Sequence, residues 1–172
     1  MIDFELNESQ KMIISNLDKN LDENFDLRIE NKKADGNKNY NHGWDEIKAL
    51  GFLGLLSSEK NGGLGLSFFD FTLTLESWGS KLCDGPYLEN SIIIFLLEKI
   101  NNDYSNNLIQ EISSSKKIIT SIISEQFIGK EQIPMIYKEN NEYFLEGNVK
   151  NLPYLEQSTD ILILALLDNE KK

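Results

Sequence analysis

The segment GFLGLLSSEKNGGLGLSFFD, residues 51 to 70, contains five glycines within fifteen residues. Glycine-rich loops bind phosphates in two well-defined patterns. A Walker loop has Lys and Ser or Thr directly after its glycines, and a dinucleotide loop follows a strand with G-x-G-x-x-G spacing. Here a predicted helix precedes the glycines, and Ser67 and a Phe pair follow them. Neither phosphate pattern is met, so we interpret the glycines as positions of positive φ that join two helices.

Two residue types that support nucleophilic or metal chemistry occur only once each, as Cys83 and His42. A lone Cys excludes a disulfide framework, and the two residues together are too few for a structural zinc site, which usually has four Cys or His ligands. A Cys–His nucleophile pair is the remaining alternative. Because Cys83 precedes a turn, the sequence favours a small hydrophobic residue there, and we predict no metal site.

The chain is acidic, with 172 residues, a formal net charge of −11 and a sequence pI of about 4.6. This charge argues against nucleic acid or an anionic membrane surface as the main partner. The longest apolar runs, residues 91–97 and 161–167, are too short to span a bilayer, and the acidic start is no signal peptide. These features predict a soluble cytoplasmic protein of one domain, or one and a half.

Helical patterns fill the first two-thirds of the chain. Asn7 and Gln10 have the spacing of a capping box. The apolar positions that follow at helical spacing are Ile14, Leu17, Leu21 and Phe25. A polar loop is expected over residues 31–43, and a short helix over 44–50 ends at Gly51.

A second group of helices follows the glycine segment. Ser67 is expected to cap a helix that has Asp70 in its first turn and ends near Gly79. Its apolar stripe comprises Phe68, Phe69, Phe71, Leu73, Leu75 and Trp78. Further helices are predicted over residues 88–100 and 105–112, with a turn at 84–87 between the first of them and the stripe helix.

The pattern changes at residue 117. Residues 117–125 are rich in β-branched side chains and predict a strand, and residues 139–142 form the turn of a predicted hairpin. Residues 161–167, ILILALL, are a fully buried strand or a helix fragment, and the Ile content favours a strand. No later segment offers this strand a partner.

The order of these segments resembles the N-terminal helical domain of the acyl-CoA dehydrogenase family. The matching series is W-D-E-I-x-x-L-G-F-L-G-L, then N-G-G-L-G-L-S and a helix with L-E-S-W-G. The part from G-F-L-G-L through G-G-L-G-L carries most of its specificity. FELNESQ (4–10), GPYLEN (85–90), IITSIISE (118–125) and the pattern of residues 145–166 extend it over nearly the whole chain. It implies a mainly α fold with a partial β-domain (α+β): a helical domain over 1–116 and an incomplete middle β-barrel over 117–172.

The resemblance also implies a chemistry. Family members bind FAD between the middle β-domain and a C-terminal helical domain, and a glutamate abstracts the α-proton of an acyl-CoA thioester while hydride passes to flavin N5. That glutamate belongs to a domain that follows Lys172, so no carboxylate here is assigned its role. Glu76 and Glu89 are the most tempting, but both are interpreted as solvated helix positions.

Cofactor contacts are implied at two places. Ser124 and Glu125 fall where the family has a flavin-contacting Thr-Glu-Pro motif, although the Pro and the following glycines are missing. The family's second flavin segment, Trp-Ile-Thr in many members, falls on Asn151, Leu152 and Pro153. This sequence lacks the aromatic ring of the Trp and the hydroxyl of the Thr at these positions. The helices over 68–78 and 88–100 are expected to wall one side of the acyl pocket, with core packing as the alternative.

Three functional hypotheses follow. The first is the front portion of a FAD-dependent acyl-CoA dehydrogenase of fatty acid metabolism, a fragment that is inactive alone; acyl-CoA oxidases share the same pattern. The second is a non-catalytic interaction subunit that pairs with a separate flavoprotein chain, through open strand edges. The third is a helical binding module unrelated to flavin. A completed enzyme is expected to form homo- or hetero-oligomers.

Overall fold

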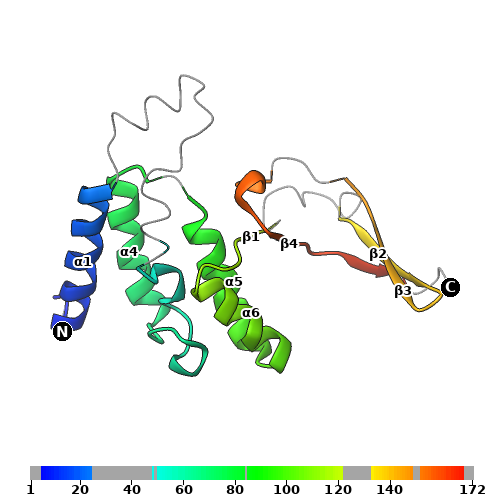
Figure 1. Cartoon of the computed structure of the whole chain (residues 1–172), viewed down its shortest axis with the longest axis horizontal. Helices are drawn as coiled ribbons and strands as arrows, with labels where there is room; N and C mark the ends of the chain where they lie inside the picture. The colour runs from blue at the N-terminus through cyan, green and yellow to red at the C-terminus, as the bar shows by residue number, and fades with distance from the viewer. Residues whose placement is uncertain are drawn as a thin grey trace, which may run out of the picture. The chain divides into compact units, whose positions relative to one another are not determined.

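The structure is a computed structural model that describes residues 5–24, 48, 50–83, 85–121, 133–148 and 152–168. The chain divides into two compact units, Met1–Lys116 and Lys117–Lys172. The described α-helices all lie in the first unit (Figure 1). They are α1 (Glu8–Asn24), α4 (Phe68–Ser80), α5 (Tyr87–Ile100) and α6 (Asp103–Ser113).

Side-chain caps set the starts of these helices. The backbone N–H of Gln10 donates to Asn7 Oδ1 and the N–H of Asn7 donates to Gln10 Oε1, both at 2.9 Å. Ser67 and Asp70 form the same reciprocal box at the start of α4. Both predicted caps are confirmed. A third box at Asn102, which the sequence interpretation missed, begins α6 two residues before the predicted start.

Helix α1 packs along α4 through an apolar stripe with a polar contact towards each end (Figure 1). Leu17 and Leu21 are fully buried in this interface. Gln10 Nε2 donates to Asp70 Oδ1 at 2.7 Å, and Lys81 pairs with Asp22. The bond from Gln10, with those from Ser67, holds the pKa of Asp70 below its usual value. The predicted helix is confirmed through Asn24; Phe25 lies outside the described residues.

The glycine segment is a buried joint between helices. It contains two short 3-10 helices, η1 (Phe52–Gly54) and η2 (Glu59–Asn61), and η1 packs on α5 and α6. Its apolar side chains Phe52, Leu53, Leu55 and Leu56 are buried. The predicted positive φ is confirmed at Gly51, Gly62 and Gly65, which have φ of 77°, 85° and 61°. The expected helix over 44–50 lies mostly outside the described residues.

The second unit contains open sheets, with no closed barrel in the described part of the chain. Strands β1 (Ile119–Ser121) and β4 (Asp160–Leu162) pair in parallel. Strand β2 (Met135–Glu139) lies between its antiparallel partner β3 (Glu142–Glu146) and its parallel partner β5 (Leu166–Asp168). The predicted hairpin is confirmed, and Asn140 and Asn141 supply the two positive φ values of its two-residue turn.

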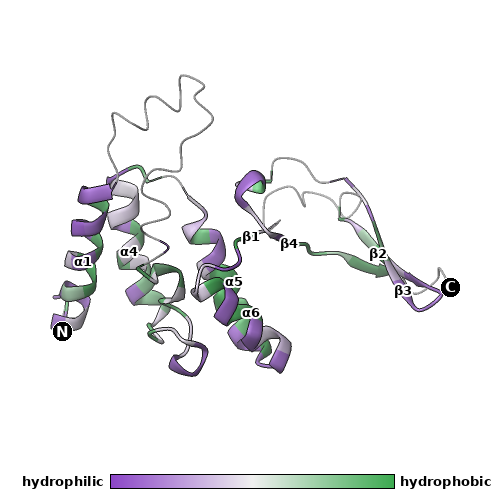
Figure 2. Cartoon of the chain, viewed as in Figure 1, coloured by the Kyte–Doolittle hydropathy of each residue, from purple (hydrophilic) through white to green (hydrophobic). Residues whose placement is uncertain are grey.

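Two predictions about residues 161–167 were wrong. The run is not one buried strand: it ends β4 and begins β5, with Ile163–Ala165 between them. Each part has a partner, β1 or β2, so the segment is not unpaired. Figure 2 shows the segment as strongly hydrophobic, yet Leu164 is 60% exposed and Leu167 58% exposed. An apolar run indicates that burial would be favourable. In these open sheets, no second layer formed by the described residues covers the run.

Candidate functional site

Aromatic rings span the space between α4 and α5. Phe68 of α4 meets Phe95 of α5 with ring centroids 5.4 Å apart, Phe71 meets Tyr87 at 5.5 Å, and Trp78 stacks on Tyr87 at 4.5 Å. We call these five residues the aromatic wall. The sequence stripe on α4 brings the first, fourth and eleventh residues of that helix to one side, where the rings face α5.

One end of the aromatic wall is buried and polar. Tyr87 is 3% exposed, and its hydroxyl lies 2.8 Å from Thr74 Oγ1. The Thr74 hydroxyl donates its proton to the Phe71 carbonyl, 2.6 Å away. The Tyr87 hydroxyl is therefore the donor in the bond between Tyr87 and Thr74. Burial raises the pKa of Tyr87 to about 12, so the phenol stays neutral near pH 7 and does not act as a base.

The other end of the aromatic wall is open and apolar. Phe68 is 48% exposed, and Leu88 and Leu96 of α5 are also exposed. Leu88, Phe95 and Leu96 are spaced at seven and eight residues, which places them on one helix face. Lys99 Nζ lies 5.1 Å from the Phe95 ring centroid at the edge of this face. Such a surface suits an apolar ligand or an apolar partner surface.

The stripe on α4 is therefore only partly a core stripe. Phe71 and Trp78 are buried as predicted, but Phe68 and Phe69 are exposed. The alternative of pure core packing accounts for the buried residues, and not for two adjacent exposed Phe side chains at the start of the helix.

A carboxylate on α5 fixes the joint that leads into α4. Glu98 Oε1 accepts from Ser58 N–H at 2.8 Å, from Ser58 Oγ at 2.9 Å and from Asn61 Nδ2 at 3.0 Å. Burial raises the pKa of Glu98, but these bonds and the charge of Lys60 outweigh that effect and lower it overall. Glu98 is thus an ionised structural acceptor near pH 7. No local sequence pattern indicates this role, because the partners of Glu98 lie about 40 residues away along the chain.

An open polar depression of about 750 Å³ lies beside η2 and α6. Its lining mixes both charges, from Glu59, Lys60, Glu111 and Lys116, with neutral amide and hydroxyl groups. Mixed charge without a convergent set of donors or acceptors indicates no particular ligand. The aromatic wall is the better candidate for a functional surface.

Most of the sequence-predicted site residues lie outside the described part of the chain. This holds for Ser124, Glu125 and Asn151, and also for His42. Of the carboxylates considered as a base, Glu76 is exposed on α4 and Glu89 is half-buried in the first turn of α5. The described residues contain no group of three His, Cys, Asp or Glu able to hold a metal ion.

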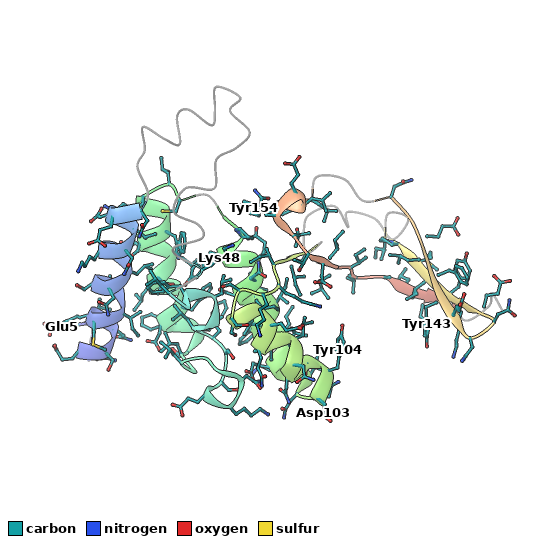
Figure 3. The ribbon with its side chains drawn as sticks, in the orientation of Figure 1. Glu5, Lys48, Asp103, Tyr104, Tyr143 and Tyr154 are labelled. Atoms are coloured by element: carbon teal, nitrogen blue, oxygen red, sulfur yellow. The ribbon has the colours of Figure 1, made fainter. Side chains whose placement is uncertain are left out.

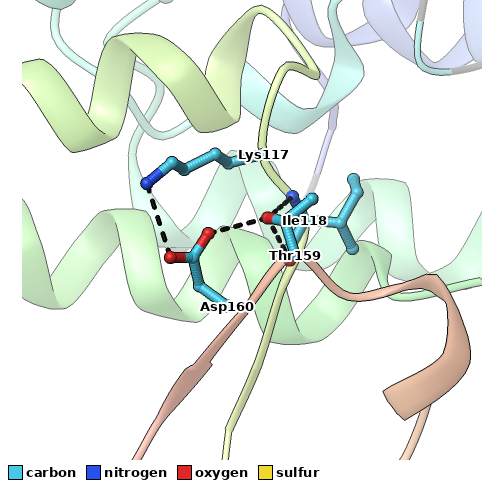
Figure 4. A network of polar contacts seen from close by, with 4 residues as sticks. All are labelled: Lys117, Ile118, Thr159 and Asp160. Atoms are coloured by element: carbon cyan, nitrogen blue, oxygen red, sulfur yellow. Dashed lines mark hydrogen bonds and ion pairs between the residues drawn. The ribbon is translucent and has the colours of Figure 1, made fainter.

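The strand pair β1–β4 is held by a polar network. Thr159 N–H donates to the Ile118 carbonyl at 2.7 Å, Ile118 N–H donates to Thr159 Oγ1, and Lys117 pairs with Asp160 at 3.4 Å (Figure 4). Thr120 Oγ1 donates to the Pro153 carbonyl at 2.6 Å. These contacts hold β1 against β4, and the Thr120 hydroxyl is engaged by the Pro153 carbonyl.

The β2–β3 hairpin carries a second exposed aromatic group. Tyr137 and Phe144 stack across the strands with centroids 5.5 Å apart, and Lys138 Nζ lies 5.3 Å from the Tyr143 ring. Tyr143 itself projects from the hairpin and is 65% exposed (Figure 3). Cross-strand pairs of this kind stabilise a hairpin. This role is sufficient to explain why aromatic residues occupy these positions.

No protein-family profile matches the sequence, and no curated protein matches it. Solved structures do share its fold. The ChsE4–ChsE5 complex from Mycobacterium tuberculosis matches with a TM-score of 0.80 over 97% of this chain, at 18% identity. A variant of the Tcur3481–Tcur3483 steroid ACAD, an acyl-CoA dehydrogenase, matches with a TM-score of 0.78 over 93%, at 15% identity. The electron transferring flavoprotein of Acidaminococcus fermentans matches with a TM-score of 0.69 over 85%, at 19% identity.

The chain spans less than half the length of these neighbours: 46%, 45% and 40% of the matched chains, in the same order. At these identities the likeness establishes the fold. The predicted resemblance to acyl-CoA dehydrogenases and the mainly α fold with a partial β-domain are confirmed at that level. In the described part of the chain, no helix is long and apolar enough to cross a membrane.

Proposed function

We propose that this chain is the helical domain and the start of the middle β-domain of a FAD-dependent acyl-CoA dehydrogenase, with residues 1–116 and 117–172 as the two parts. The observation that carries the proposal is the aromatic wall, whose exposed end supplies an apolar surface to a chain with this fold. The ordered sequence motifs support it independently of the fold.

In this proposal the chain contributes a wall of the acyl pocket. Phe68, Phe95 and Leu96 offer apolar contacts to an acyl chain and exclude water from it. The neutral, buried Tyr87 holds the rings in place without adding a charge. The part proposed for this face is to bind and orient the acyl chain.

The described residues do not by themselves fit a flavin. Leu152 and Pro153 bring no hydroxyl to the ring, and the Thr120 hydroxyl is engaged by the Pro153 carbonyl. We therefore derive no step through FAD. Ser124 and Glu125 remain the proposed cofactor contacts, and a chain with both replaced by Ala tests them through FAD retention in the assembled enzyme.

We also propose that the 172-residue chain alone does not oxidise acyl-CoA. The purified chain is mixed with FAD and a series of acyl-CoA thioesters under anaerobic conditions, and the flavin absorbance is followed. No bleaching is expected. Substrate-dependent bleaching of chain-bound flavin would overturn the claim of inactivity.

A second candidate function is a non-catalytic subunit that pairs with a separate flavoprotein chain. Two fold neighbours carry names of paired components, ChsE4–ChsE5 and Tcur3481–Tcur3483, and the exposed apolar side chains of β4 and β5 offer a surface for a partner. Purification from the native source separates the two functions. Intact mass well above 19.7 kDa for the polypeptide supports the first, and a 19.7 kDa chain that copurifies with a flavoprotein supports the second.

A further inference from the structure

The joint between helices contains the only Asn-Gly dipeptide in the chain, Asn61–Gly62. In a flexible segment the backbone nitrogen of Gly62 attacks Cγ of Asn61, because glycine has no Cβ to hinder the approach. The Cγ–N bond of the side-chain amide breaks, ammonia leaves, and a succinimide ring forms. Water then opens the ring to aspartate or isoaspartate, so the net change consumes one water and releases one ammonia.

The fold restrains both reacting groups of this dipeptide. Asn61 is 2% exposed, and its Nδ2 donates to Glu98 Oε1 at 3.0 Å and to Asn106 Oδ1 at 3.1 Å. The attacking nitrogen is also engaged, because Gly62 N–H donates to the Glu59 carbonyl at 3.0 Å. The leaving group and the nucleophile are therefore held by separate partners while the joint is closed.

The same contacts make the product incompatible with the closed joint. An aspartate at position 61 has no side-chain proton to give to Glu98 or Asn106. It would instead place a second carboxylate within hydrogen-bonding distance of Glu98, which already carries a charge near pH 7. Two like charges in contact repel each other, and Asn106 Oδ1 loses its donor.

We propose that Asn61 is a latent deamidation site, protected by Glu98 and Asn106, and that its conversion irreversibly opens the joint that leads into α4. The site belongs to the helical unit and does not depend on the proposed function. Opening is needed before conversion, so the rate reports how often the joint opens. Conversion then prevents closure.

The test measures conversion of Asn61 by peptide mass spectrometry during incubation at mildly alkaline pH. In the folded full chain, conversion should be at least about tenfold slower than in the same chain in denaturant, since only the open fraction reacts. Glu98→Gln should raise the rate in the folded chain severalfold. The matched control, Glu76→Gln on the exposed face of α4, should leave it unchanged. Equal rates in folded and denatured chain would overturn the protection.

A second measurement tests the consequence. Hydrogen exchange is compared between the wild-type chain and Asn61→Asp, and we expect severalfold faster exchange over residues 57–66 in the variant. Wild-type protection in Asn61→Asp would overturn the proposal. If the variant does not fold, wild-type chain partly converted by incubation is digested with protease. Faster cleavage of the converted fraction within residues 57–66 supports the proposal, and equal cleavage overturns it.

Discussion

The rings of Phe68 and Phe95 meet at 5.4 Å and an interplanar angle of 53°, and they join two helices at the exposed end of the aromatic wall. The two residues are 27 positions apart in the sequence. A tilted arrangement at this distance is favourable for aromatic pairs beyond the area that they bury. The pair therefore ties the start of α4 to α5 where the surface is open.

Truncation of either ring should cost stability in a way that depends on the other ring. Phe68→Ala, Phe95→Ala and the double variant form a cycle, and we expect a coupling of about 0.5–1.5 kcal/mol in denaturant unfolding. Phe69→Ala paired with Phe95→Ala is the control, because Phe69 is exposed on the neighbouring face. Additive effects in the first cycle would show that the ring contact is not formed in solution.

Removal of the Tyr87 hydroxyl should lower the unfolding free energy of the helical unit at neutral pH. It should also remove part of the stability loss that occurs above pH 10. Tyr87→Phe loses one buried hydrogen bond to Thr74, at a cost of about 0.5–1.5 kcal/mol. The pKa of Tyr87 is raised from 10.0 to about 12, so the stability linked to its neutral form is complete below pH 10 and is lost as pH rises towards 12.

The measurement is the unfolding free energy of both chains from pH 7 to pH 12. The wild-type value should fall more steeply than that of Tyr87→Phe above pH 10. The two curves should converge and then cross, because a rise of about two pKa units corresponds to about 2.7 kcal/mol, more than the hydrogen bond contributes. Parallel curves would contradict the burial of the phenol. Thr74→Val, which keeps the shape of Thr74 and removes its hydroxyl, should leave a high-pH loss in place.

Glu98 should stabilise the joint only while it is ionised. Glu98→Gln is expected to cost about 1 kcal/mol. This is below the range of about 1.5–3 kcal/mol for bonds to a charged group, because solvent still reaches the carboxylate. The pKa of Glu98 is lowered, so this contribution is present above its usual value of 4.5 and is lost as pH falls through the lowered value.

Unfolding of wild type, Glu98→Gln and the control Glu76→Gln is compared between pH 7 and pH 3. The difference between wild type and Glu98→Gln should be constant above about pH 5 and shrink below it. A difference that stays constant down to pH 3 would exclude the ionised carboxylate as the cause.

The sequence predicted what depends on neighbours along the chain. The caps at Asn7 and Ser67, the hairpin turn at Asn140–Asn141 and the positive φ of the joint glycines are local, and their chemistry is carried by a few adjacent residues. The hydrogen bonds of Glu98 to Ser58 and Asn61 are not local, and no pattern within α5 indicates them. The same limit explains residues 161–167, because an apolar run does not specify whether one strand or two will use it.

Gly63 in the joint and Gly79 near the end of α4 should respond oppositely to an added methyl group. A Cβ on Gly63 would lie 2.2 Å from the Gly54 carbonyl oxygen and 2.3 Å from that of Ser57. Backbone atoms cannot move aside as a flexible side chain does, so Gly63→Ala should cost at least about 1–3 kcal/mol.

Gly79, in the last turns of α4, has open space at its Cβ position and no positive φ. Gly79→Ala should therefore stabilise the chain by about 0.5–1 kcal/mol through its higher helix propensity. Thermal unfolding of both variants measures the contrast, and a Gly63→Ala chain as stable as wild type would mean that the joint is not packed as closely as its backbone distances indicate.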